Sequence, residues 1–190
     1  MAEIQAVNPT IAAITLEPLA ADHLDGIMSW INDPAVTFYF ANFGKDLSRE
    51  EEAAYIEKMQ SSSDDRLFSA FGDVDLQGAP ASLPRYLGQF GLSQIYWPAR
   101  TARLGVMMPA YAGGHGVAAR ACQHLLERAF GELGLNKVWL IVRSDNAKGL
   151  HLWTKVGFRC EGVLKQEYWA QGRYFDMLRM AILASEFAVS

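Results

Sequence analysis

Apolar residues recur at helical spacing in two stretches near the start of the chain. The first stretch runs over residues 24–31, and we expect that helix to end at Asp33-Pro34, because proline restricts the backbone of the residue before it. The second helix begins after Ser48, since Ser48 and Glu51 have the spacing of a capping box. A short apolar strand at residues 14–19 precedes both helices, so this part of the chain predicts the order β-α-α.

The remainder of the pattern predicts strands that are interrupted by two helices. One amphipathic helix begins near Val117 and another covers residues 147–156. The strands are expected at residues 67–71, 86–97, 102–108, 138–142, 162–169 and 174–182. The complete order, β-α-α-β-β-β-α-β-α-β-β, predicts a mixed α/β fold with a mostly antiparallel central sheet flanked by helices.

Two segments have no such periodicity. Residues 1–12 are predicted to be a loose leader, and residues 72–84, rich in Gly, Pro, Ala and Asp, are predicted to form a long exposed loop. We find no interior linker or repeat, so residues 1–190 are interpreted as a single domain.

Composition narrows the class of protein. Hydrophobic residues make up 51% and charged residues 20% of the 190 residues, which is typical of a fully packed domain. The net charge of −4 argues against binding to nucleic acid or to an anionic membrane. Two cysteines are too few for a disulfide framework, and the four histidines lack metal-ligand spacing. We therefore expect a cytoplasmic protein without a metal.

A glycine-rich loop, residues 112–116, lies between a predicted strand and the helix at Val117. Glycines there let backbone N–H groups approach a ligand at a helix N-terminus, which is typical of a phosphate site. The alternative is a tight turn with no ligand. The segment 114–119 also satisfies the dinucleotide pattern G-x-G-x-x-A, but the antiparallel strands before it argue against a nicotinamide cofactor.

Residues 102–158 resemble the GCN5-related N-acetyltransferases. The pyrophosphate loop of that family, Gln/Arg-x-x-Gly-x-Gly/Ala, corresponds to Gly113, Gly116 and Ala118, with Gly113 where the family has Gln or Arg; a register shifted by one residue is also compatible. The segment 146–158 resembles the family pattern N-A-x-S-x-x-x-x-x-K-x-G-F. For the first residue of that segment, Asn146, a simple helix cap is the alternative interpretation.

The resemblance implies an enzyme that uses acetyl-CoA. The residues implied to contact the coenzyme lie on the strand before the loop, in the loop, and at the following helix: Val106, Met107, Met108, Gly113, Gly114, His115, Gly116, Val117, Ala118, Asn146 and Trp153. Two positions depart from the family, because Trp153 stands where many relatives have a tyrosine acid and Arg103 where many have a glutamate. Asp33 is the remaining candidate for a general base, and a helix stop is its alternative role.

The acceptor is expected to be the primary amine of a small molecule, which attacks the thioester directly. A protein N-terminus is the alternative acceptor, and a non-catalytic acyl-CoA sensor is the alternative function. The tail of the sequence, residues 161–176, resembles a branch of the family that includes both acceptor types. Relatives often form homodimers, so a homodimer is possible by analogy. Seven aromatic residues are candidates for the acceptor side: Phe38, Tyr39, Phe40, Tyr96, Trp97, Tyr168 and Trp169.

Overall fold

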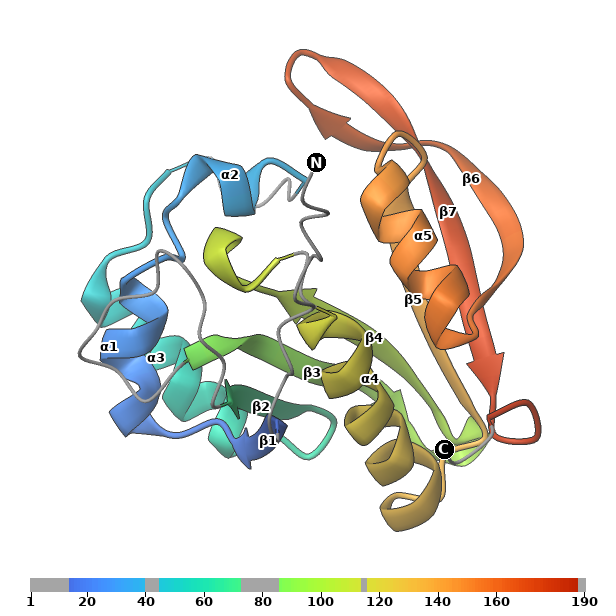
Figure 1. The fold of residues 1–190 in the computed structure, drawn as a ribbon, viewed down its shortest axis with the longest axis horizontal. Helices are drawn as coiled ribbons and strands as arrows, with labels where there is room; N and C mark the ends of the chain where they lie inside the picture. Colours follow the sequence, from blue (N-terminus) through green and yellow to red (C-terminus); the bar gives the residue numbers. More distant parts are fainter. Residues whose placement is uncertain (1–13, 40–44, 73–85, 114–115, 188–190) are drawn as a thin grey trace, which may run out of the picture.

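The protein is built on one seven-stranded sheet with the strand order β1-β2-β3-β4-β5-β7-β6 (Figure 1). The computed structural model describes residues 14–39, 45–72, 86–113 and 116–187. The strands are β1 (Ile14–Pro18), β2 (Arg66–Gly72), β3 (Tyr86–Tyr96), β4 (Thr101–Met107), β5 (Lys137–Arg143), β6 (Arg159–Ala170) and β7 (Arg173–Leu183). Every neighbouring pair is antiparallel except β4 and β5, which confirms the predicted mixed, mostly antiparallel sheet.

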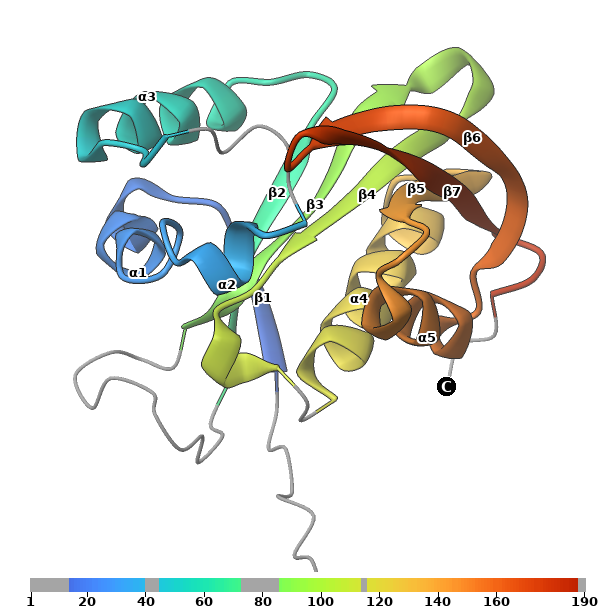
Figure 2. The same cartoon turned by 90° about the horizontal axis from the view of Figure 1, so that it is seen from above.

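Helices cover both faces of this sheet (Figure 2). One face carries α1 (Leu24–Met28), α2 (Pro34–Thr37) and α3 (Arg49–Gln60), and the other carries α4 (Val117–Glu127) and α5 (Ala147–Val156). Shorter helical turns are η1 (Ala21–His23), η2 (Trp97–Ala99), η3 (Ala110–Ala112) and the π-turn η4 (Arg128–Glu132). Each face has its own apolar core, and the sheet separates the two cores.

The helix α3 begins as the sequence predicts. The Ser48 hydroxyl accepts a hydrogen bond from the Glu51 amide at 3.2 Å, and the Glu51 carboxylate accepts one from the Ser48 amide at 2.9 Å. These two bonds satisfy groups that a helix start otherwise leaves unpaired. The face of α3 toward the sheet carries two buried side chains, Ile56 and Glu52, and Glu52 is only 3% exposed.

The segment around Asp33 differs from the prediction. The helix α1 already ends at Met28, and Asp33 caps a new short helix, α2, with its Oδ1 atom 2.8 Å from the Ala35 amide. Proline at the first position of a helix loses no hydrogen bond and has a suitable φ, so Pro34 begins a helix here instead of only ending one. The result is one helix more than the sequence predicted on this face.

The strands β4 and β5 lie side by side over only part of their length. They pair in parallel at three positions, Thr101 with Lys137, Ala102 with Val138 and Arg103 with Trp139. Beyond the last pair, β4 continues to Met107 and β5 to Arg143 without pairing to each other. The sheet therefore opens into a V in its centre, with β4 on one arm and β5 on the other (Figure 1).

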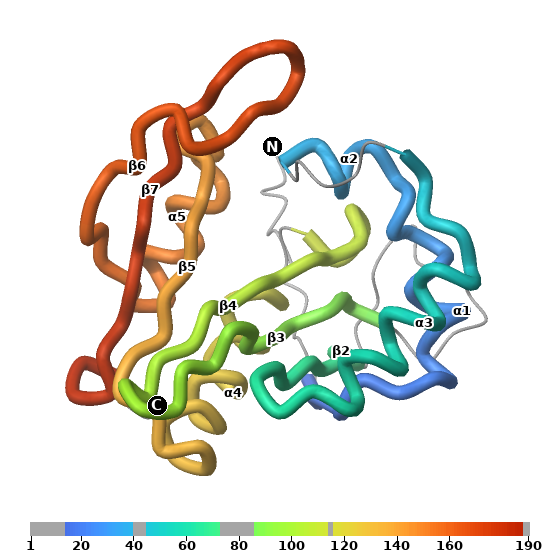
Figure 3. The backbone as a smooth tube through the Cα atoms, turned by 180° about the vertical axis from the view of Figure 1, so that it is seen from behind, coloured from blue at the N-terminus to red at the C-terminus, as the bar shows by residue number. Residues whose placement is uncertain are grey.

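A long hairpin of β6 and β7 forms the far edge of the sheet, and its tip projects past the neighbouring strands (Figure 3). The register shifts between Leu164 and Tyr168, where Gln166 has a φ of +50°. Asp176 of β7 holds this bulge, because its carboxylate accepts hydrogen bonds from the Gln166 amide at 2.9 Å and the Lys165 ammonium at 2.8 Å. Bulges of this kind redirect the side chains that follow them. The predicted leader and most of the predicted 72–84 loop lie outside the described residues.

Candidate active site

A cavity of about 480 Å³ occupies the opening between β4 and β5. It reaches residues of both faces of the sheet, from α2 on one side to α4 and α5 on the other. Its walls are formed by Ala35, Val36, Tyr39, Arg103, Leu104, Val106, Met107, Met108, Ala110, Ala118, Leu140, Ile141, Val142, Arg143, Asn146, Lys148, Gly149, Leu152, Trp153, Tyr168 and Met177. Most of these side chains are apolar, and the polar ones are concentrated at the two ends of β5.

The glycine loop leads into α4 through a left-handed residue. Gly116 has a φ of +75° and is the N-cap of α4, a conformation that costs a residue with a side chain about 1–2 kcal/mol. The first backbone N–H groups of a helix have no acceptor within it and lie at the positive end of its dipole, so this end can hold a phosphate. Ala118 lines the cavity here, whereas Val117 is buried in the core, and residues 114–115 lie outside the described part.

Asn146 serves as the cap of α5 and also lines the cavity. Its Oδ1 atom accepts a hydrogen bond from the Gly149 amide at 2.9 Å, so the interpretation as a helix cap is confirmed. The capping bond occupies Oδ1 and leaves the amide nitrogen for a ligand. Trp153, two turns further along α5, is 9% exposed and packs against Phe158 with ring centroids 5.8 Å apart.

The cavity wall formed by β4 and the residue after it includes Val106, Met107 and Met108, which were predicted to contact the coenzyme. On its other side, β4 lies against Gly88 of β3, where an added Cβ atom would be only 2.4 Å from the Met107 carbonyl oxygen. Glycine is thus required at position 88, where φ is +135°. Among the described residues, the peptide groups of β4 that face β5 have no partner strand beyond Arg103, so they are available to an extended ligand.

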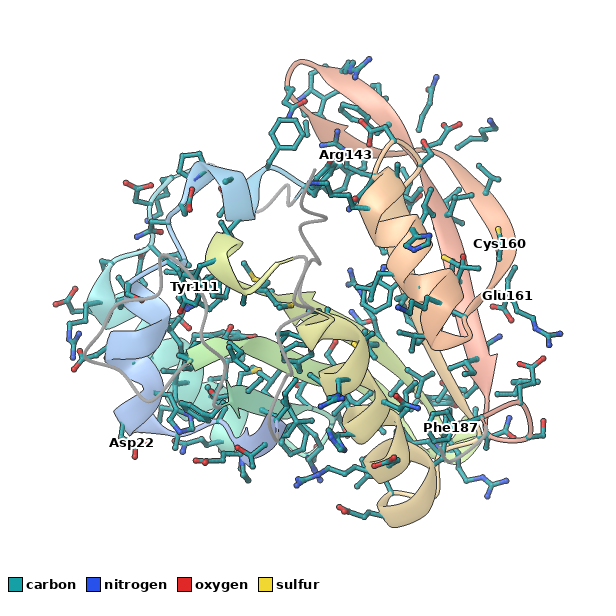
Figure 4. The ribbon with its side chains drawn as sticks, in the orientation of Figure 1. Asp22, Tyr111, Arg143, Cys160, Glu161 and Phe187 are labelled. Carbon is teal, nitrogen blue, oxygen red and sulfur yellow. The ribbon has the colours of Figure 1, made fainter. Side chains whose placement is uncertain are left out.

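At the α2 end of the cavity, Arg143 organises a cluster of aromatic rings (Figure 4). Its guanidinium, 2% exposed as a residue, binds the Asp145 carboxylate through Nε at 2.9 Å and Nη2 at 2.7 Å. Its Nη1 atom donates to the Phe38 carbonyl at 3.3 Å, and the Phe175 ring centroid lies 3.8 Å away. The paired charges lower the pKa of Asp145 and raise that of Arg143. Arg143 therefore joins α2 to the loop that carries Asn146.

The hydroxyl of Tyr168 closes the same end of the cavity by donating to the Tyr39 carbonyl at 3.0 Å. Burial raises the pKa of the Tyr168 phenol, so it stays protonated near neutral pH. Both tyrosines line the cavity and were among the aromatic candidates of the sequence, as was Phe38, which lies 5.4 Å from the Arg143 guanidinium. Phe38, Tyr96, Trp97 and Trp169 do not line the cavity, and Phe40 lies outside the described residues.

Asp33 does not line the cavity, and its carboxylate caps α2. The residues of this segment that line the cavity are Ala35, Val36 and Tyr39. Arg103 does line the cavity. Among the described residues, no Asp or Glu side chain lines it. The two positions that resemble the acid and base positions of the family are occupied by Trp153 and Arg103.

Sequence reasoning missed Arg143. A signal was present, because Arg143 continues an apolar strand on the face of Trp139 and Ile141 and is followed two residues later by Asp145. An arginine at such a position needs an ionic partner close by. Nothing in the sequence indicates that the rings around it come from α2 and β7.

In the described ranges, no group of three or more His, Cys, Asp and Glu residues is arranged to hold a metal ion. Within the same ranges, none of the helices has the length and apolar character needed to cross a membrane.

Comparison with known proteins agrees with this geometry. Residues 13–159 match the family model described as "Acetyltransferase (GNAT) domain". The spermidine N(1)-acetyltransferase of Escherichia coli K12 is 26% identical over 179 residues, which cover 94% of this chain and 90% of that protein. A putative ribosomal N-acetyltransferase of Bacillus subtilis, YdaF, is 28% identical over 117 residues, 60% of this chain and 64% of the relative.

A solved structure shows the same fold. The spermidine N-acetyltransferase from Vibrio cholerae, in complex with CoA and spermine, superimposes with a TM-score of 0.80 at 27% identity, covering 91% of this chain and 96% of that chain. The family model spans well over half of the sequence, including the glycine loop, Asn146 and both arms of the V. The chain therefore belongs to the GNAT family of acetyltransferases.

Proposed function

We propose that the protein transfers the acetyl group of acetyl-CoA to a primary amine of a small molecule. The observation that carries this proposal is the parting of β4 and β5 beside the N-terminus of α4. One cavity there reaches phosphate-binding geometry on one face and an aromatic-lined end on the other. A relative with the same fold was solved in complex with CoA and spermine, which supports a site for a coenzyme and an amine.

The residues present fit an extended phosphate-bearing coenzyme. The first amides of α4, after Gly116, would bind a pyrophosphate, and the peptide groups of Val106, which have no partner strand on the β5 side among the described residues, would hold the pantetheine arm. Asn146 would contribute its free side-chain amide. Acetyl-CoA, when bound, supplies a thioester that an uncharged amine can attack. Peptide N–H groups of β4 near Met108 would then polarise the thioester carbonyl.

The amine must lose its proton before it reacts. An alkylamine has a pKa near 10, so only about one molecule in 10³ is uncharged at pH 7. The apolar wall formed by Val36, Met107 and Met177 disfavours the charged form and would lower that pKa. Asp33 would have to leave the cap of α2 to act as a base, so we propose that the amine loses its proton to solvent.

The leaving thiolate needs little help from an acid, because a thiol has a pKa of about 8.5 and its thiolate is therefore only a weak base. Trp153 occupies the family's usual acid position, but an indole N–H is not a practical proton donor. The ring would therefore act only as part of the cavity wall. Rate enhancement would then come mainly from positioning within the V. Tyr168 would help by closing the α2 end of the cavity.

The test is calorimetric titration with acetyl-CoA, CoA and NAD, followed by release of free CoA with a panel of small amines and a panel of N-terminal peptides. We expect micromolar binding of both CoA species and turnover with small amines. Turnover with peptides alone would favour the protein N-terminal alternative. Tight acetyl-CoA binding without turnover on any amine would favour the acyl-CoA sensor.

We also propose a homodimer in the cytoplasm. The twelve-residue strand β6 is an edge of the sheet, and long uncovered edges are usually protected by a partner. Val163, Trp169 and Tyr174 on this hairpin are about half exposed, at 49%, 56% and 59%. Cys122 and Cys160 are both free thiols, which suits a reducing compartment. Light scattering of the purified protein measures the oligomeric state directly.

A further inference from the structure

The cavity wall carries positive charge on the face of the sheet toward α1, α2 and α3. Side chains alternate along a strand, and Leu104, Leu140 and Val142 face the core under α4 and α5. Arg103 and Arg143, at alternate positions, therefore face the side of α1, α2 and α3, where the amine must enter. The third cation of the wall, Lys148, lies in the first turn of α5, on the coenzyme side.

The two arginines on the amine side differ in how their charge is balanced. Arg143 has a carboxylate partner, Asp145, at 2.7 Å. Arg103 has no carboxylate partner among the described residues, and its guanidinium carbon lies 5.9 Å from the centroid of the Trp139 ring. Arg103 is thus the unbalanced charge of the amine side.

The surroundings of Arg103 add further positive charge. The guanidinium carbon of Arg179 on β7 also lies over the Trp139 ring, 4.0 Å from its centroid. The acid beside it, Glu161, is shared, because it also forms an ion pair with Lys137 as well as contacting Arg179 at 3.7 Å. One carboxylate therefore serves two cations, and none remains for Arg103 in the described part of the chain.

An acceptor must be compatible with this charge. A polyamine brings two or more ammonium groups, and each one left protonated would be repelled by an unbalanced guanidinium in a site of reduced dielectric constant. A carboxylate on the acceptor would instead form a charge-assisted, two-pronged pair with that guanidinium.

We propose that the acceptor is an amine that also carries a carboxylate, and that Arg103 is the residue that selects it. This inference rests on the proposed acetyl transfer and specifies its substrate class. The proposed acceptor differs from the polyamine named for the spermidine N-acetyltransferase relatives, because an unbalanced guanidinium lines the cavity of this chain.

The test uses acceptors of one chain length that differ only at the far end: 4-aminobutanoate, butylamine and 1,4-diaminobutane, with spermidine added. We expect kcat/KM for the carboxylate to exceed that for butylamine by about tenfold and that for either polyamine by more, in line with a charge-assisted pair in a partly exposed site. Binding of the same compounds to the CoA-bound protein, measured by calorimetry, should follow the same order.

Substitutions of Arg103 test whether this residue selects the acceptor. Arg103→Gln should lower the ratio of carboxylate to butylamine turnover about tenfold, Arg103→Lys should keep most of it, and Arg103→Glu should shift the preference toward 1,4-diaminobutane. Arg159→Gln, at a site 77% exposed on the outer hairpin, is the matched control and should leave the ratio unchanged. A circular dichroism spectrum and melting temperature for each variant exclude unfolding as the cause.

Each outcome has one meaning. Preference for 1,4-diaminobutane or spermidine by the unaltered protein, or an equal loss on all acceptors in Arg103→Gln, would overturn the inference while leaving acetyl transfer intact. If no amine is acetylated and no acceptor binds the CoA complex, the proposed function fails and the inference fails with it.

Discussion

Arg143 and Asp145 form a two-pronged ion pair at the point where β5 ends, with Nε–Oδ1 and Nη2–Oδ2 distances of 2.9 Å and 2.7 Å. The arginine is almost fully buried, whereas the aspartate side chain is 41% exposed. Because Arg143 also binds the Phe38 carbonyl, this pair fixes the α2 wall relative to the loop before α5. Its loss should therefore affect both stability and catalysis.

We expect Asp145→Asn to lower the free energy of unfolding by about 1–2 kcal/mol at pH 7, less than for a fully buried pair because Asp145 is partly solvated. The folded-state pKa of Asp145 is lowered, so its contribution is present above the unfolded pKa of about 4 and is lost as pH falls through the folded value. Urea unfolding at pH 7, 5 and 3 measures this. The difference between variant and parent should shrink at pH 3.

Asp25→Asn is the control for that experiment, because the pair of Asp25 with Arg49 is exposed on both sides, 74% and 55%. Exposed pairs contribute little, so a change below about 0.5 kcal/mol is expected. A difference for Asp145→Asn that is as large at pH 3 as at pH 7 would contradict the assignment.

Gly116→Glu should weaken acetyl-CoA binding by at least about tenfold, because it adds negative charge at the helix end that would receive the pyrophosphate. Gly134→Glu is the matched control: Gly134 has a similar φ of +62°, and a Cβ atom there would meet nothing within 4 Å. Both variants carry the same backbone strain, so calorimetry with acetyl-CoA separates strain from charge. Equal affinity for acetyl-CoA in the two variants would contradict the placement of the pyrophosphate at this loop.

Gly88→Ala should destabilise the protein by more than about 2 kcal/mol, since its Cβ atom would be 2.4 Å from the Met107 carbonyl and its φ is +135°. Thermal and urea unfolding measure the loss. Gly105→Ala on β4 is the comparison, because nothing lies within 4 Å of a Cβ atom there. If the two alanines are equally well tolerated, β3 and β4 are not held as closely as the structure shows.

Trp153→Phe should keep kcat within about threefold of the parent, because the indole provides shape and no proton, whereas loss of a true general acid costs about 10²–10⁴. Steady-state kinetics with the best acceptor from the amine panel measures this. A fall of a hundredfold or more would show that the indole N–H takes part in the chemistry. Leu150→Ala, on the same helix but outside the cavity wall, controls for lost packing.

Most of the fold was accessible from the sequence, because its elements have strong local signals. The capping box at Ser48, the stripe of α4 and the cap at Asn146 all lie where the pattern put them, and α5 has the predicted bounds. The helix α2 was missed because Asp-Pro both ends and begins helices, and only the surrounding packing decides between the two.

The site was accessible only in part. Val106, Met107, Met108, Ala118, Asn146 and Trp153 were predicted and do line the cavity. The Arg143 cluster was not predicted, because it joins residues more than a hundred positions apart, and no local pattern records such contacts. Tyr168 was among the aromatic candidates, but its hydrogen bond to the Tyr39 carbonyl was not predictable, because the two residues are 129 positions apart.

The V between β4 and β5 also means that the sheet is missing one strand along half its length. In the described part of the chain, β4 and β5 each have an inner edge without a partner strand beyond Arg103 and Trp139, and water would satisfy the peptide groups there. An extended ligand lying between them would act as that strand, built from pantetheine instead of amino acids. Binding would thus complete the architecture of the sheet, so the liganded protein should be the more rigid and the less prone to pair with other chains.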